Sequence, residues 1–68
     1  MKTFGEILRE KRIAKGWTQS FIAKSVGVSN HQVCKWEHNA HFPNLIVATD
    51  LAILLGCTLD ELAGLEGK

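Results

Sequence analysis

Residues 18–38, which read TQSFIAKSVGVSNHQVCKWEH, decide the fold of this 68-residue chain. Two segments with a helical pattern, 19–26 and 30–38, lie on either side of Gly27. A hydroxyl residue precedes each segment and can cap a helix, while glycine suits the turn because it accepts a left-handed backbone. The stretch therefore predicts two short helices joined by a tight turn.

The second of these helices has two different sides. At about 100° per residue, Val33 and Trp36 fall on one side, whereas His31 and Lys35 fall on the opposite side. Two large apolar side chains favour burial, and a histidine with a lysine favours water or an anion. The helix is therefore expected to rest on a core and to present polar groups outward.

Outside this stretch, the same signals predict three further helices. Thr3 and Glu6 have the spacing of a capping box, and an apolar run later in the chain ends at a glycine. These helices are expected over residues 4–15, 45–55 and 59–63. No segment has the alternation of a strand, so the sequence predicts an all-α, compact five-helix bundle in a single domain over residues 1–68.

The composition is typical of a folded domain in a reducing compartment. Hydrophobic residues make up 46% of the chain and charged residues 22%. Cys34 and Cys57 lack the spacing of a metal site, and no signal peptide or membrane-spanning run is seen, so we expect a cytoplasmic protein. The net charge is only +1, but residues 1–41 hold seven Lys and Arg against three Glu, whereas residues 42–68 hold one Lys against four acids. This asymmetry favours an anion-binding face.

Residues spaced along nearly the whole chain also match one known pattern. They are Leu8, Arg12, Gly16, Trp17, Thr18, Gln19, Ile22, Ala23, Gly27, Val28, Ser29, Val33, Trp36, Glu37, Pro43, Leu45, Ala52, Leu55, Gly56 and the run Leu59-Asp60-Glu61-Leu62. In this register the chain closely resembles the Cro/C1-type (XRE) helix-turn-helix family of phage and bacterial repressors.

The resemblance implies both a fold and a function. The fold is the lambda-repressor-like bundle, in which the second and third helices form the helix-turn-helix. The function is that of a sequence-specific DNA-binding transcriptional regulator, in this family a repressor. The implied partner is a double-stranded, pseudo-palindromic operator bound by a homodimer, in the bacterial nucleoid or in a phage-infected host cell.

The resemblance further assigns base-reading positions. Family members contact bases from the positions of Asn30, His31 and Lys35, with Gln32 and His38 as flanking contacts. An Asn amide can bond to adenine at two points, and Lys can donate to guanine O6 and N7. These five side chains are therefore expected to face bases in the major groove.

A second set is expected to contact DNA phosphates. It comprises Gln19, Ser29, Lys11, Lys15, Lys24, Asn39 and His41. Gln19 matches a family residue that grips a phosphate and braces Asn30, and the exposed N–H groups at that helix start attract phosphate as well. For each lysine the alternative is an ordinary solvated surface charge.

Glu37 lies near the edge of the buried side of its helix, where a lone carboxylate needs a partner. The resemblance supplies one, because family members pair the arginine at the position of Arg12 with this glutamate. Such a pair fixes the orientation of two helices more than it adds stability.

The fourth predicted helix carries a second apolar stripe. Ile46 and Ile53 lie within about 20° of each other, away from the core side. An exposed apolar stripe marks an interface, and an operator with half-sites about 34 Å apart requires a dimer. We expect Ile46, Ile53, Cys57 and Leu59 to form a two-fold contact, with packing inside one chain as the alternative.

The sequence is also compatible with three other functions. An antitoxin would use the same fold, with a long partner-binding extension that the sequence lacks, and a protein-interaction module fits the small net charge. An enzyme is the weakest alternative, since no nucleophile with a positioned base and no phosphate-binding glycine loop is seen. We expect no cofactor, no small-molecule substrate and no membrane partner.

The third predicted helix carries three residues of types that can bind a metal ion. His31, Cys34 and His38 lie within about 60° of one another on that helix. Three ligands along one helix rarely close a tetrahedral site, so no metal is expected.

Overall fold

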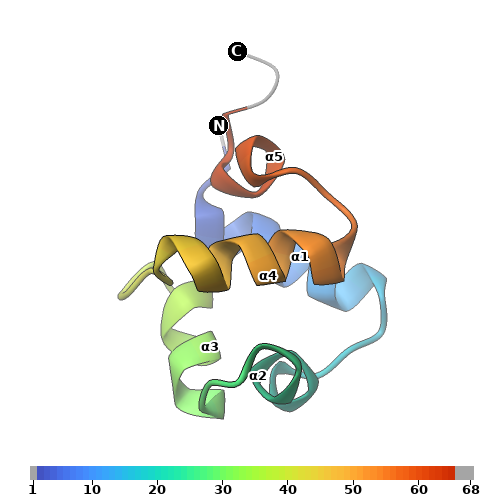
Figure 1. Cartoon of the computed structure of the whole chain (residues 1–68), viewed down its shortest axis with the longest axis vertical. Coiled ribbons are helices and arrows are strands. Elements are labelled where there is room, and N and C mark those ends of the chain that lie inside the picture. Colours follow the sequence, from blue (N-terminus) through green and yellow to red (C-terminus); the bar gives the residue numbers. More distant parts are fainter. Residues whose placement is uncertain (1, 66–68) are drawn as a thin grey trace.

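The computed structural model describes residues 2–65, and within them the chain forms five helices and no strand. The helices are α1 (Phe4–Ala14), α2 (Gln19–Val26), α3 (Asn30–Glu37), α4 (Leu45–Leu55) and α5 (Leu59–Ala63) (Figure 1). The prediction of an all-α, five-helix bundle is confirmed. α1 and α3 each end one residue earlier than predicted, because Lys15 and His38 form C-caps whose N–H groups bond back to the last turn. Within residues 2–65, no helix is both long and apolar enough to cross a membrane.

Each helix begins at a side chain that accepts a hydrogen bond from the backbone N–H three residues later. These caps are Thr3, Thr18, Ser29, Asn44 and Thr58. The first N–H groups of a helix have no partner within it, so such caps define where a helix starts. At the other end of α2, Gly27 takes a φ of 75°, a conformation that strains residues with a side chain. Local signals of this kind place the helix-turn-helix in the sequence.

Every helix gives one side chain to the centre of the core. The largest fully buried side chains are Leu8, Ile22, Val33, Leu51 and Leu62, which come from α1 to α5 in that order. Burial of one such side chain stabilises the fold by about 1.5–3 kcal/mol relative to its exposure. Because each comes from a different helix, all five helices take part in one shared core.

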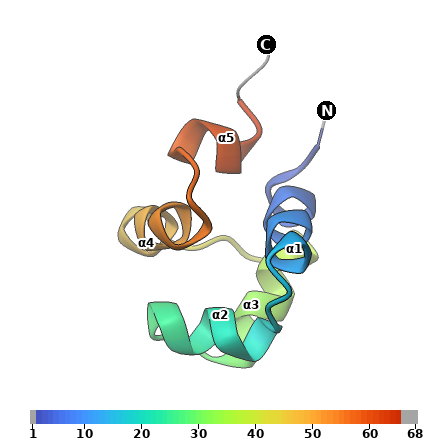
Figure 2. The ribbon, with the colours of Figure 1, turned by 90° about the vertical axis from the view of Figure 1, so that its right-hand side faces the viewer.

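The packing of the helices leaves one side of α3 open to solvent. α3 packs on α2 and on α1, while α5 packs on α1 and on α4. Figure 1 shows α4 crossing the molecule between α5 and the α2–α3 pair, and Figure 2 shows α1 and α4 on opposite sides of the bundle. Asn30 and His31, at the start of α3, are exposed.

Two aromatic residues pack together where α1 connects to α2: Trp17 lies in the connection and Phe21 lies in the first turn of α2. The ring centroids of Trp17 and Phe21 lie 4.7 Å apart in a tilted arrangement. Contacts of this type contribute about 0.5–1.5 kcal/mol beyond the burial of their area. The pair therefore helps to fix the chain where it enters the helix-turn-helix.

Candidate nucleic-acid interface

α3 has the two sides that its sequence predicted. Val33 and Trp36 are 0% and 4% exposed and belong to the core. Asn30 and His31 are exposed on the outward side, where Lys35 is half-buried. A helix supported from beneath, with polar side chains at its N-terminal end, has the shape and chemistry to enter the major groove of DNA.

Ser29 and Gln32 close the N-terminal end of α3 in a capping box. Ser29 Oγ accepts the Gln32 N–H at 3.2 Å, and Gln32 Oε1 accepts the Ser29 N–H at 3.0 Å. Both residues are exposed. The amide oxygen of Gln32 is engaged in the cap, so its NH₂ group is the part suited to donate to a base or phosphate.

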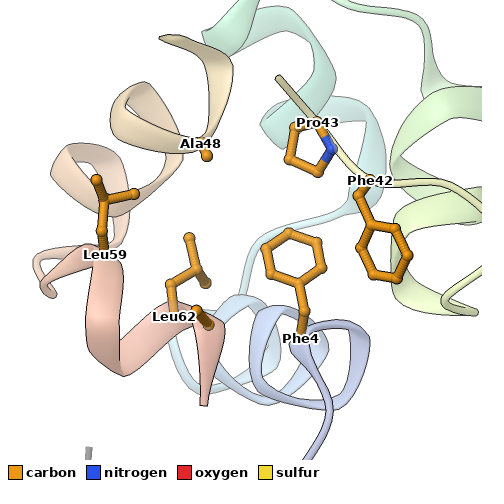
Figure 3. A pocket seen from close by; sticks show the side chains of 7 residues that line it. Phe4, Phe42, Pro43, Ala48, Leu59 and Leu62 are labelled. Atoms are coloured by element: carbon orange, nitrogen blue, oxygen red, sulfur yellow. The ribbon is translucent and has the colours of Figure 1, made fainter. Parts of the chain in front are cut away.

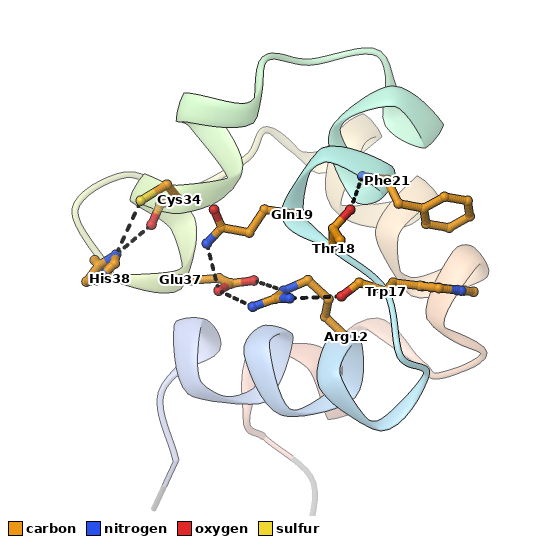
Figure 4. A network of polar contacts seen from close by, with 8 residues as sticks. All are labelled: Arg12, Trp17, Thr18, Gln19, Phe21, Cys34, Glu37 and His38. Atoms are coloured by element: carbon orange, nitrogen blue, oxygen red, sulfur yellow. Dashed lines mark hydrogen bonds and ion pairs between the residues drawn. The ribbon is translucent and has the colours of Figure 1, made fainter.

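The ion pair expected between α1 and α3 is present (Figure 4). Arg12 Nε donates to Glu37 Oε2 at 2.6 Å, and Arg12 Nη2 donates to Glu37 Oε1 at 3.2 Å. The two side chains are only 14% and 3% exposed. Arg12 Nη1 also donates to the Trp17 carbonyl at 2.9 Å, and Gln19 Nε2 donates to Glu37 Oε1 at 3.1 Å. One carboxylate therefore joins α1, the start of α2 and the end of α3.

A polar hollow of about 200 Å³ opens beside this network. It is lined by Arg9, Arg12, Gln19, Glu37 and His38. Gln19 and His38, both predicted to contact DNA, therefore share one surface. Arg9 is a residue that the sequence analysis missed, although a signal was available: Arg9 and Arg12 are three residues apart on α1 and so share a face of the helix.

A second hollow, of about 310 Å³, lies along the outward side of α3. It is lined by His31, Gln32, Lys35, Trp36, His41 and Phe42. His41 comes from the loop after α3, yet it lies beside His31 and Lys35. The structure thus brings a predicted phosphate contact next to two predicted base-reading residues.

The three lysines predicted as phosphate contacts lie in different surroundings. Lys11 meets Glu61 of α5, Nζ to Oε2, at 2.5 Å. The Lys15 ammonium lies 5.5 Å from the Trp17 ring centroid, and Lys24 is exposed in the last turn of α2. The ammonium of Lys11 is therefore drawn toward α5, and that of Lys15 toward the aromatic pair.

Asn39, also predicted near a phosphate, follows the C-cap of α3 with a φ of 60°. Its Oδ1 accepts the Gly5 N–H at 3.0 Å, and its Nδ2 donates to Thr3 Oγ1 at 3.0 Å. The structure therefore places the side chain of Asn39 on the start of α1.

Cys34 and His38 lie together on the flank of α3 (Figure 4). His38 Nδ1 is 2.8 Å from the Cys34 carbonyl oxygen and 3.7 Å from Cys34 Sγ. Within residues 2–65, no three His, Cys, Asp or Glu side chains are arranged to hold a metal ion.

The apolar stripe on α4 is open to solvent. Ile46 and Ile53 are each 74% exposed, and Leu59 is 37% exposed. Cys57 is half-buried in the connection to α5. The sequence left two alternatives for these isoleucines, a two-fold contact or packing inside one chain. Packing inside one chain leaves both of them uncovered.

An apolar hollow of about 210 Å³ lies between the start of α1, the loop before α4, α4 itself and α5 (Figure 3). It is lined by Phe4, Phe42, Pro43, Ala48, Leu59, Leu62 and Ala63. The rings of Phe4 and Phe42 meet edge to face at 5.9 Å, although Phe42 is 63% exposed. The sequence analysis missed Phe42 because it lies in a loop, where no helical period marks a buried or exposed position.

Comparison with known proteins agrees with this geometry. A family model described as helix-turn-helix matches residues 8–62, and the chain belongs to this family. Its fold is similar to that of the P22 c2 repressor in a crystal structure with synthetic operator 9T in the presence of Tl⁺. That likeness has a TM-score of 0.91 and 30% sequence identity, and it covers 97% of this chain and 100% of that one. The DNA-binding domain of the P22 c2 repressor, determined by nuclear magnetic resonance in solution, is similar with a TM-score of 0.84 and 33% identity, covering 90% of this chain and 80% of that one. No curated protein matches the chain.

Proposed function

We propose that this chain is a sequence-specific DNA-binding repressor of the Cro/C1 type, with α3 as its recognition helix. The observation that carries the proposal is the two-sided α3, with Val33 and Trp36 buried beneath it and Asn30 and His31 exposed in front. The likeness to the P22 c2 repressor, whose structure contains a synthetic operator, supports it. We propose no enzymatic activity.

Base reading is assigned to the outward side of α3. Asn30 can bond to adenine at two points, and Lys35 can donate to guanine O6 and N7. His31 lies between them on the same surface, while Gln32, through its NH₂ group, and His38 flank them. Hydrogen bonds to base edges carry the sequence preference.

Phosphate contacts are assigned to six polar residues, of which Arg9, Gln19 and His41 line the two polar hollows. They are Arg9, Lys15, Gln19, Lys24, Ser29 and His41. Lys11 is left out, because its ammonium pairs with Glu61 on α5. Contacts of this kind hold the protein on DNA without regard to sequence and make the affinity depend on salt.

The active form is a homodimer in the cytoplasm, formed through the α4 stripe (Ile46 and Ile53) together with Cys57 and Leu59. The exposure of two isoleucines on one helix face supports this assignment. A two-fold dimer presents two copies of α3 to half-sites about 34 Å apart, so the operator is pseudo-palindromic.

Selection from random DNA tests the proposal. Fragments retained by the protein in a gel-retardation assay are amplified and sequenced, and we expect a two-fold symmetric site to be enriched. Lys35→Ala should alter the enriched sequence, whereas Lys2→Ala, which removes the same charge from an exposed residue paired with Glu10, should not. Weak retention with no enriched sequence would contradict the proposal and favour a protein-interaction module.

A further inference from the structure

The start of α1 receives a cap from a residue far away in the sequence. Thr3 Oγ1 accepts the Glu6 N–H at 3.2 Å, which is the local cap. The Gly5 N–H, in the first turn, has no acceptor within the helix. Asn39, which follows the C-cap of α3, supplies the missing acceptor: its Oδ1 accepts the Gly5 N–H at 3.0 Å.

The backbone at the end of α3 holds Asn39 in the orientation that this contact needs. The Asn39 N–H bonds to the Trp36 carbonyl at 3.1 Å, and the Ala40 N–H bonds to the Lys35 carbonyl at 2.9 Å. Between them Asn39 takes its φ of 60°, which Asn tolerates better than most residues do. Its Nδ2 then donates to Thr3 Oγ1 at 3.0 Å, so both polar ends of the side chain are engaged on α1.

Gly5 makes the approach possible. A Cβ atom at Gly5 would lie 2.6 Å from the Glu37 carbonyl oxygen and 2.7 Å from the Trp36 carbonyl oxygen. Both are backbone atoms of the last turn of α3, which cannot yield as a flexible side chain can. The first turn of α1 therefore lies directly against the C-terminal end of α3.

We propose that Asn39 is a positioning residue for DNA recognition, which sets the direction of α3 from its C-terminal end without touching DNA. The proposal rests on the proposed function. At 1.5 Å per residue, Asn30 lies about 10 Å along the axis of α3 from the last helical residue, Glu37, so a tilt of about 5° at that end would move Asn30 by about 1 Å. A binding site tolerates errors of only about 0.5 Å in its side chains.

The central test is Asn39→Gly, which keeps the left-handed backbone accessible and removes both contacts to α1. Operator affinity is measured with a half-site duplex, so that dimer contacts do not enter, at a temperature where both proteins are folded. We expect the affinity to fall about tenfold. That is the scale of one or two hydrogen bonds between α3 and DNA, which a tilted α3 would no longer make. The slope of affinity against salt should stay unchanged, because no phosphate contact is lost.

Variants at Thr3 probe the same joint from α1. Thr3→Ser keeps the hydroxyl and should bind as the wild type does, whereas Thr3→Ala should lose affinity. Thr58→Ala, the same loss of a helix cap but on α5, is the matched control and should lower stability without changing half-site affinity.

The amide hydrogen of Gly5 gives a readout that needs no DNA. It should exchange slowly with solvent in the wild type and faster in Asn39→Gly. Wild-type affinity in Asn39→Gly would overturn the positioning role, and so would a loss of affinity with a salt slope reduced by about one, which marks a phosphate contact. A wild-type chain that selects no sequence would instead overturn the proposed function.

Discussion

Arg12 and Glu37, 25 residues apart in the chain, meet at two points, with Nε 2.6 Å from Oε2 and Nη2 3.2 Å from Oε1. Their side chains are 14% and 3% exposed. A buried pair of this kind adds little net stability over a well-packed apolar pair, but it strongly resists the loss of either partner. It therefore fixes how α1 and α3 lie against each other.

Glu37→Ala is expected to destabilise the protein by about 3 kcal/mol or more, because the charge of Arg12, a side chain only 14% exposed, loses its carboxylate partner. Urea denaturation of the two proteins measures the difference. Glu10→Ala, which breaks an ion pair whose members are 60% and 56% exposed, is the control and should leave the midpoint near that of the wild type. Equal midpoints for Glu37→Ala and the wild type would show that the pair is not important to the fold.

Glu6 should make stability depend on pH. Hydrogen bonds from the Thr3 backbone N–H, and then from its hydroxyl, lower the pKa of Glu6 below its ordinary value of 4.5. A carboxyl group with a lowered pKa stabilises the folded state above its unfolded pKa, and this contribution is lost as the pH falls through the folded value.

Glu6→Gln keeps an acceptor in the capping box but cannot titrate. The difference in melting temperature between the wild type and this variant should therefore shrink as the pH is lowered from about 6 to about 3. A difference that stays constant across that range would mean that the Glu6 carboxylate gains nothing from its Thr3 contacts.

Lys35→Ala and Lys24→Ala should weaken DNA binding in different ways. Loss of a base contact at Lys35 should cost about 1–3 kcal/mol on the selected site and relax the preference there. Loss of a phosphate contact at Lys24 should weaken binding to all sequences alike and reduce the salt slope by about one. Fluorescence anisotropy on specific and random duplexes separates the two effects. Identical behaviour of the two variants would reject the division of roles.

Ile53→Glu should abolish the homodimer, because it places a charge on the apolar α4 stripe, where Ile53 is 74% exposed. Sedimentation equilibrium should then show a monomer at concentrations where the wild type is dimeric. Ile13→Glu is the control, since Ile13 is 56% exposed on α1, outside the proposed contact. If the wild type is itself monomeric at high concentration, or if Ile53→Glu remains dimeric, the α4 stripe is not the interface.

The candidate site shows where prediction from sequence works and where it fails. The outward side of α3 follows from the helical period, so the exposure of Asn30 and His31 was predictable. Arg9 could have been found from its spacing to Arg12. The contact of Gln19 with Glu37 could not have been predicted from the sequence. A glutamine side chain can reach several partners, and only the packing of α2 on α3 selects one.

The sequence by itself determined the helices, their caps and the side of α3 that faces outward. These features depend on residues within a few positions of one another, and hydrogen bonds between near neighbours act at short range whatever the rest of the chain does. The tertiary structure alone decided that Asn39 caps α1, that Lys11 turns to Glu61 and that the isoleucines of α4 stay uncovered. Each of these depends on how two helices lie against each other, which is set by the shape of the whole core and not by any local pattern.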